Sequence, residues 1–193
     1  MKKFCIIFIV ISLLSCVLDN AKDNVNYVNV RDDVNKNKIK QRYIVDGYTI
    51  EIIDDGNAAM IVQHSSTKTE IQIPSQIQGL PITVIGYRSF QSNALRSVII
   101  PDSVTYIEYA AFLGNPLTNI TIPKSVSSIG GFAFYDNLLT SITIGENVIL
   151  EGGFWDPKYA GDYVFTREFD EYYYNNGCKA GTYTYSNGRW SLQ

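Results

Sequence analysis

Apolar residues recur through the middle of the chain with a period of 22 residues. Each unit carries one asparagine at the same place: Asn93, Asn115 and Asn137. Six apolar positions match across three units: Ile82, Val104 and Val126; Ile85, Ile107 and Ile129; Phe90, Phe112 and Phe134; Leu95, Leu117 and Leu139; Val98, Ile120 and Ile142; Ile100, Ile122 and Ile144. A fixed period in the twenties with constant apolar offsets is typical of a solenoid. Because no unit can bury its apolar face alone, the sequence predicts stacked coils.

The repeats cover only part of the chain. The first unit begins near residue 70 and is longer than the next two, and residues 76–81 predict a loop that holds its extra residues. After Ile144 the pattern weakens, because Glu151 falls where the preceding units have an isoleucine. We therefore place the repeats in residues 70–150, as about three full coils.

Both flanks of the repeats predict capping structures. Residues 41–69 alternate in strand fashion around turns such as Asp46-Gly47, which indicates an N-terminal β-meander. In residues 151–193 the spacing of aromatic residues predicts a helix over 166–176, and Asn187-Gly188 predicts the turn of a hairpin over 182–192. A solenoid needs such caps because an open end exposes its core.

The first residues have the layout of an export signal. A basic start precedes an eleven-residue apolar run, which is too short to span a bilayer. The run ends in Leu13-Leu14-Ser15-Cys16, which resembles a bacterial lipobox, although Leu14 departs from its commonest form. This resemblance implies a lipoprotein signal peptide in residues 1–15, a lipid on Cys16 and membrane attachment through it. An ordinary signal peptide is the alternative. Residues 16–40, rich in Asn, Asp and Lys, predict a flexible tether.

Composition argues against several classes of function. The net charge of −3 and the lack of a basic cluster disfavour nucleic acid as a partner. His64 is the single histidine, and its polar surroundings predict an exposed residue at a hairpin tip. Glu168, Asp170 and Glu171 predict the solvated face of the C-terminal helix. No spacing indicates a metal site or a cofactor, so we expect a protein that is not an enzyme.

Two sets of outward-facing residues are candidates for binding. Alternation along the strands with the Val98 position directs Asn119, Thr121, Ser141 and Thr143 outward. A second set contains the aromatic residues Tyr109 and Phe132. Exposed aromatic rings suit a recognition surface, but they would equally pack on the neighbouring coils.

The repeat unit resembles the BspA-like, or treponemal-type, leucine-rich repeat. The likeness extends from Glu70 to about Val148, with Glu108, Ser89 and Gly145 departing from the pattern. Residues 174–190 also resemble the C-terminal part of many spirochaetal members. The resemblance implies a mostly β leucine-rich-repeat solenoid in a bacterial envelope or cell-surface protein.

These observations favour a lipid-anchored envelope protein that binds a protein or extracellular-matrix ligand, as an adhesin does. One alternative is a carbohydrate-binding module that uses Tyr183, Tyr185 and Trp190 as a stacking platform. Another is a purely structural envelope protein.

Overall fold

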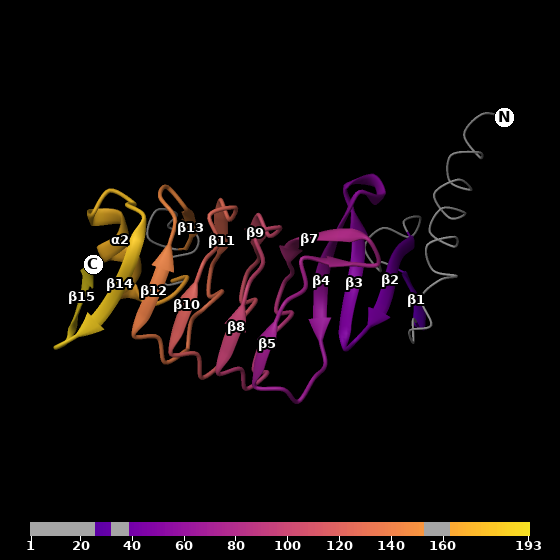
Figure 1. The fold of residues 1–193 in the computed structure, drawn as a ribbon, viewed down its shortest axis with the longest axis horizontal. Coiled ribbons are helices and arrows are strands. Elements are labelled where there is room, and N and C mark those ends of the chain that lie inside the picture. Colours follow the sequence, from indigo (N-terminus) through magenta and orange to yellow (C-terminus); the bar gives the residue numbers. More distant parts are fainter. Residues whose placement is uncertain (1–25, 32–38, 153–162) are drawn as a thin grey trace.

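The protein folds as an elongated β-solenoid whose coils stack side by side (Figure 1). The computed structural model describes residues 26–31, 39–152 and 163–193. The predicted signal peptide and Cys16, the predicted site of lipid attachment, lie outside these residues.

Fifteen strands, one short 3₁₀ helix and one α-helix are described. The N-terminal elements are β1 (Asn26–Arg31), β2 (Ile39–Val45), β3 (Tyr48–Ile53), η1 (Asp54–Gly56) and β4 (Ala58–His64). The coils contain β5 (Glu70–Gln72), β6 (Gln76–Ile77), β7 (Leu80–Ile85), β8 (Ser97–Ile99), β9 (Tyr106–Ile107), β10 (Asn119–Thr121), β11 (Ser128–Gly130), β12 (Ser141–Ile144) and β13 (Ile149–Glu151). The chain ends in α2 (Arg167–Asn175), β14 (Gly181–Ser186) and β15 (Arg189–Leu192).

The strands form two walls of the solenoid. One wall is a nine-stranded sheet in the order β1-β2-β3-β4-β7-β9-β11-β13, with β6 paired to β7. The other wall holds the pair β5-β8 and the four-stranded sheet β10-β12-β14-β15. The strands of successive coils pair in parallel, with Ile129 opposite both Ile107 and Leu150. The predicted N-terminal meander is confirmed: β2, β3 and β4 pair antiparallel, and β4 joins the first coil through β7.

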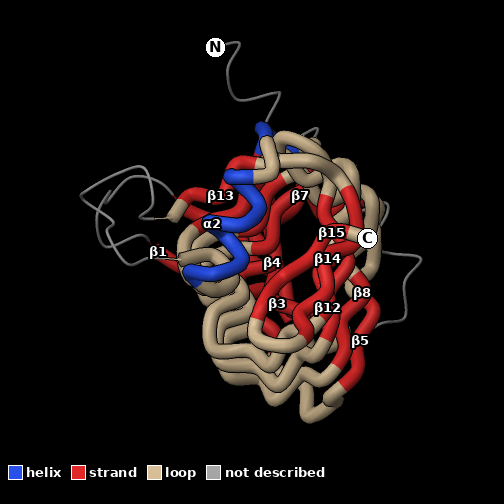
Figure 2. The backbone as a smooth tube through the Cα atoms, turned by 90° about the vertical axis from the view of Figure 1, so that its left-hand side faces the viewer, coloured by secondary structure: helices blue, strands red, loops and turns tan. Residues whose placement is uncertain are grey.

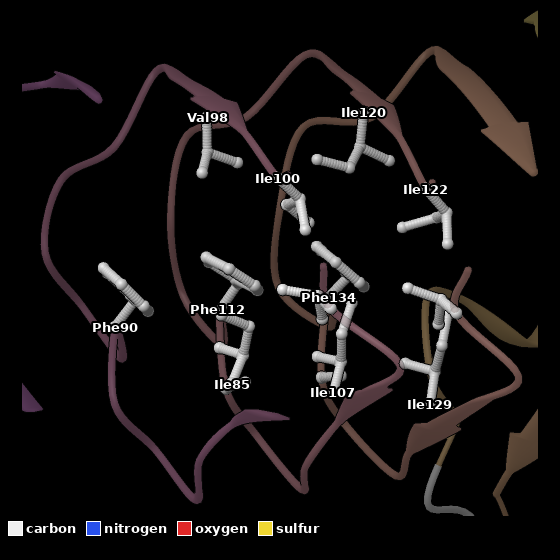
Figure 3. Packing of buried hydrophobic residues seen from close by; sticks show 14 of the residues in the cluster. Ile85, Phe90, Val98, Ile100, Ile107, Phe112, Ile120, Ile122, Ile129 and Phe134 are labelled. Carbon is white, nitrogen blue, oxygen red and sulfur yellow. The ribbon is translucent and has the colours of Figure 1, made fainter. Parts of the chain in front are cut away.

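The repeated apolar residues form columns along the axis of the solenoid (Figure 3). Phe90, Phe112 and Phe134 stack with their ring centroids 5.0 and 5.1 Å apart and their planes within 13°. Ile85, Ile107 and Ile129 form a parallel column and are fully buried. The residues predicted from the period to form the core are therefore confirmed as the core, except that Leu139 is only partly buried against it.

The phenylalanine column extends beyond the predicted repeats at both ends. Phe165 stacks on Phe134 at 5.0 Å, although it follows a longer segment of chain. At the other end the ring of His64 lies 5.1 Å from that of Phe90. The prediction that His64 is exposed was wrong, because its side chain closes this column and is only 5% exposed.

A fourth coil also differs from the sequence prediction. Leu150, and not Glu151, pairs with Ile129 and is buried, because this coil is one residue shorter than the others. Glu151 points outward and accepts hydrogen bonds from Tyr106 and Ser128. The solenoid thus has about four coils and not three.

Two loops predicted at the N-terminal side contain strands instead. The insertion in the first coil is a hairpin of β6 and β7, whose turn residues Gln78 and Gly79 both have positive φ. Residues 26–31, inside the predicted tether, pair as β1 with β2. Apart from β1 and residues 39–40, that segment lies outside the described residues.

The asparagines of the second and third units each bond the backbone of two coils. The Asn115 amide donates to the carbonyls of Phe90 and Phe112, both at 2.9 Å, and its oxygen accepts from the Leu95 N–H at 2.9 Å. Asn137 repeats this arrangement one coil later. Asn93 differs, because its oxygen lies 3.3 Å from His64 Nδ1. Its Nδ2 donates to the Gln91 carbonyl, so the His64 nitrogen is the donor to Asn93.

The C-terminal cap is confirmed as a helix followed by a hairpin, and it covers the end of the coils (Figure 2). Thr166 caps α2 by accepting the Phe169 N–H. Phe169, Tyr173 and Tyr183 are fully buried and continue the core. β14 pairs antiparallel with β12, so the hairpin extends the wall of the last coil.

Asp170 departs from the predicted solvated face of the helix. It is 2% exposed, and its carboxylate accepts the N–H groups of Val164 at 2.7 Å and Phe165 at 3.3 Å. These bonds hold the segment that places Phe165 on the aromatic column. Burial raises the pKa of Asp170 to about 7, against the opposing effect of the two N–H donors.

This raised pKa predicts a pH dependence of stability. The carboxyl binds its proton more tightly in the folded chain, so its contribution is full below pH 4 and is lost as the pH rises through about 7. In that window the free energy of unfolding should fall by about 1.4 kcal/mol per pH unit from this group. Urea denaturation at several pH values should show that Asp170→Asn removes this slope. A variant with an unchanged slope would contradict the assignment.

Candidate binding surfaces

Four aromatic side chains form a continuous row on the outside of the solenoid. Tyr87 stacks on Tyr109 with centroids 5.8 Å apart, and Phe132 meets Tyr109 edge to face at 5.5 Å. Tyr135 then packs on Phe132 at 5.2 Å. We call these four residues the aromatic ridge. Tyr87 and Tyr135 remain 55% and 41% exposed, while the two central rings are half-buried.

The backbone of the coils sets the position of the ridge. The residues that follow Tyr87, Tyr109 and Gly131 all have a left-handed conformation, with φ between 53° and 57° at Arg88, Ala110 and Phe132. The same turn therefore recurs at the end of β7, β9 and β11 and brings out one aromatic ring per coil. In the third coil Gly131 stands at the tyrosine position, and Phe132 supplies the ring instead.

Charged groups lie at the first tyrosine of the ridge. The Arg88 guanidinium lies 5.1 Å from the centroid of the Tyr87 ring, within cation–π range. A carboxylate oxygen of Glu108 accepts the Tyr87 N–H at 2.6 Å. These contacts fix both the backbone and the ring of Tyr87, although the residue is exposed.

The second candidate surface is the outer face of β10, β12 and β14, which we call the hydroxyl face. Asn119 and Thr121 are exposed, and Ser141 and Thr143 are half-buried beside them. Thr143 lies opposite Thr121 and Thr182 in the pairing, and its hydroxyl is 2.9 Å from that of Thr182. The face is therefore lined by short polar side chains.

The predicted site residues thus fall on two surfaces. Tyr109 and Phe132 follow strands of the nine-stranded sheet, whereas Asn119, Thr121, Ser141 and Thr143 lie on the opposite wall. The sequence missed Tyr135 as a member of the ridge, because its coil position holds Gln91 and Leu113 in the other units. The sequence left open whether the rings of Tyr109 and Phe132 pack on neighbouring coils or form an exposed surface. In the structure the rings pack on each other and still reach solvent.

The aromatic platform considered for sugars is not available as predicted. Tyr183 is fully buried and Trp190 is 6% exposed, because both pack on Phe169 in the C-terminal cap. Tyr185 alone of the three is exposed, and its ring lies against that of Trp190. The sequence alone could not distinguish a buried core residue from an exposed sugar-stacking residue, because aromatic side chains serve in both roles.

The single histidine packs in the core, as described above. Burial lowers the pKa of His64, whose ring packs against those of Tyr48 and Phe90. No three potential metal ligands come together in the part of the chain that the structure describes. Within the same residues, no helix has the length and apolar character required to cross a membrane.

Stacked coils of about 22 residues, each with a buried aromatic ring and isoleucine columns, define a leucine-rich-repeat solenoid. Residues 83–153 match the family model described as the BspA type leucine-rich repeat region, in six copies. The repeat region of this chain belongs to that type, as the sequence predicted. Modules of this type generally bind proteins and typically occur in surface or exported bacterial proteins.

Solved structures of bacterial leucine-rich-repeat proteins resemble the chain. One from T. pallidum is 18% identical, with 55% of this chain and 62% of that protein covered and a TM-score of 0.45. One from Bacteroides capillosus is 24% identical, with 57% and 99% covered and a TM-score of 0.42. A leucine-rich cell surface protein of Faecalibacterium prausnitzii is 18% identical, with 78% and 60% covered and a TM-score of 0.26. The chain spans less than two thirds of the first and third proteins. No curated protein matches it.

Proposed function

We propose that this chain is a lipid-anchored protein of the bacterial cell envelope that binds a protein or extracellular-matrix ligand through the aromatic ridge. The observation that carries the proposal is the row of four contacting rings with two exposed ends. Large apolar rings contribute most of the energy in protein interfaces, and Tyr is enriched among the dominant residues.

The ridge suits binding better than the hydroxyl face does. Its rings are held by the stacked coils and by one another, so little side-chain entropy is lost when a partner covers them. The side chains of the hydroxyl face are short and already bond one another, as Thr143 and Thr182 do. They offer a partner less apolar area.

The binding test compares two surfaces on the same scaffold. In the double variant Tyr87→Ala/Tyr135→Ala, we expect saturable binding to a solubilised extracellular-matrix extract to weaken by about 30-fold or more, since each dominant aromatic contributes about 1–2 kcal/mol or more. Ile99→Ala is the matched control, because Ile99 is 58% exposed on the other wall. Equal loss in both variants, or no saturable binding by the wild type, would contradict the proposal and favour a purely structural role.

The lipid anchor is tested separately. Cys16→Ser should move the protein from the membrane fraction to the soluble fraction of cells, because the acylated thiol is the proposed attachment. Fractionation followed by immunoblotting measures this, with Cys178→Ser as the control. An unchanged membrane fraction for Cys16→Ser would refute the anchor without bearing on the ridge.

A further inference from the structure

The two walls of the solenoid begin at different places. The nine-stranded sheet continues past β7 through β4, β3, β2 and β1, whereas the opposite wall begins at β5 (Figure 1). Among the described residues, no strand pairs with the outer edge of β5. The meander therefore extends only the wall that contains β7. On the opposite wall, the position next to β5 holds no strand of the described residues.

The backbone groups of β5 alternate between the two edges. Thr69 and Ile73 bond the neighbouring strand β8: the Ser97 N–H donates to the Thr69 carbonyl, and the Ile73 N–H donates to the Ile99 carbonyl. In a parallel pair every second residue bonds the same neighbour, so Glu70 and Gln72 direct their N–H and C=O groups to the outer edge. There the Tyr48 hydroxyl donates a hydrogen bond of 3.5 Å to the Gln72 carbonyl, so this acceptor already has a partner within the chain.

A groove lies along this edge. A cavity of about 620 Å³ is lined by Asp46, Tyr48, His64, Lys68, Glu70 and Ile71, among others. A smaller cavity of about 190 Å³ shares Asp46, Tyr48 and Pro74 with it. The inner wall offers aromatic and aliphatic groups, and the rim carries the carboxylates of Asp46 and Glu70 and the ammonium group of Lys68. Neither carboxylate has an ion-pair partner among the residues that the structure describes.

We propose that this groove binds an extended peptide, which adds to β5 as a strand. The edge N–H groups of Glu70 and Gln72 and the carbonyl of Glu70 recognise a peptide backbone, as in other cases of strand addition. Side chains of the added strand alternate between the two faces. Those beside Glu70 on the outer face are basic, and those that face Tyr48 and Ile71 are apolar. The site is separate from the aromatic ridge and does not depend on it.

The test uses a fluorescein-labelled eight-residue peptide of alternating lysine and valine with the purified full chain. We expect saturable binding by fluorescence anisotropy and at least tenfold slower amide exchange at Glu70 and Gln72. A peptide with glutamate in place of lysine should bind less tightly by up to about fivefold, since an opposite-charge pair across strands contributes about 0.2–1 kcal/mol. Glu70→Lys should reverse this preference. N-methylation of alternate peptide residues should abolish binding, because it removes the donors.

A second variant tests the backbone contact directly. Gln72→Pro removes one outward N–H and leaves the β5–β8 bonds in place, so peptide affinity should fall while the unfolding transition persists. Unchanged exchange at Glu70 and Gln72 with millimolar peptide would overturn the proposal. So would slow exchange at both amides without peptide, which means that the chain covers its own edge. Protection that grows with protein concentration would assign the edge to a second copy and overturn it equally.

Discussion

Replacing Phe112 by alanine should lower the free energy of unfolding by about 3–5 kcal/mol, the usual cost of deleting a buried phenylalanine ring. Phe112 has no exposed surface and stacks on a ring at each side, 5.0 and 5.1 Å away. The deletion therefore leaves a void between two coils that contact only their neighbours. Urea denaturation measures the loss.

The matched control is Phe112→Leu, which refills most of the volume and should cost less. A loss below about 1 kcal/mol for the alanine variant would contradict the continuous aromatic column, because such a value is typical of a surface site. Native stabilities are only about 5–15 kcal/mol, so the alanine variant should also be visibly less soluble on expression.

Asn115→Ala should also destabilise the fold strongly, with an expected loss of about 2–4 kcal/mol. The side chain is 2% exposed, and its removal leaves the Leu95 N–H and the Phe90 carbonyl without their partner. Each buried group left unpaired costs about 1–3 kcal/mol. The Phe112 carbonyl loses less, because it also accepts from the Asn137 amide at 3.0 Å.

Asn93→Ala provides the comparison within the same column. Asn93 is half-buried and its two bonds, to His64 and Gln91, are both 3.3 Å long, so its loss should be about 1 kcal/mol or less. Thermal or urea unfolding of both variants gives the difference. Equal losses at the two positions would mean that the asparagines do not act through the inter-coil bonds described above.

The sequence predicted the parts of the fold that follow the period. The isoleucine and phenylalanine columns and the two caps all depend on local spacing and turn residues. A fixed period specifies the columns directly, because each coil repeats the contacts of its neighbour. The caps follow instead from turn residues such as Asp46-Gly47 and Asn187-Gly188.

The sequence predictions fail where a residue makes contacts outside the regular 22-residue spacing. Phe165 joins the aromatic column 31 residues after Phe134, so no constant offset reveals it. His64 closes the same column from inside a polar run, and Leu150 is displaced by a coil one residue shorter. Asp170 looks like a surface residue of a helix until the folded chain places two N–H groups against it.

The candidate sites show the same limit. Outward-facing residues could be predicted from alternation, but the contacts of Tyr87 with Tyr109 and of Phe132 with Tyr135 depend on the left-handed turn that recurs in each coil. The edge of β5 could not be predicted at all, because it arises from a mismatch between the two walls. With about four coils, the surface of one molecule is small, and many copies on one membrane would strengthen weak contacts by avidity.

Site-specific photo-crosslinking tests the proposed role of the aromatic ridge most directly. A photoreactive phenylalanine analogue is introduced at Tyr87 in one strain and at Tyr185 in another, two tyrosines that are 55% and 42% exposed on different parts of the molecule. After intact cells are incubated with extracellular-matrix protein and irradiated, position 87 should yield a discrete covalent adduct that excess unlabelled wild-type protein suppresses, and position 185 should not. An equal yield at both positions, or no adduct at position 87, would contradict the ridge as the binding surface.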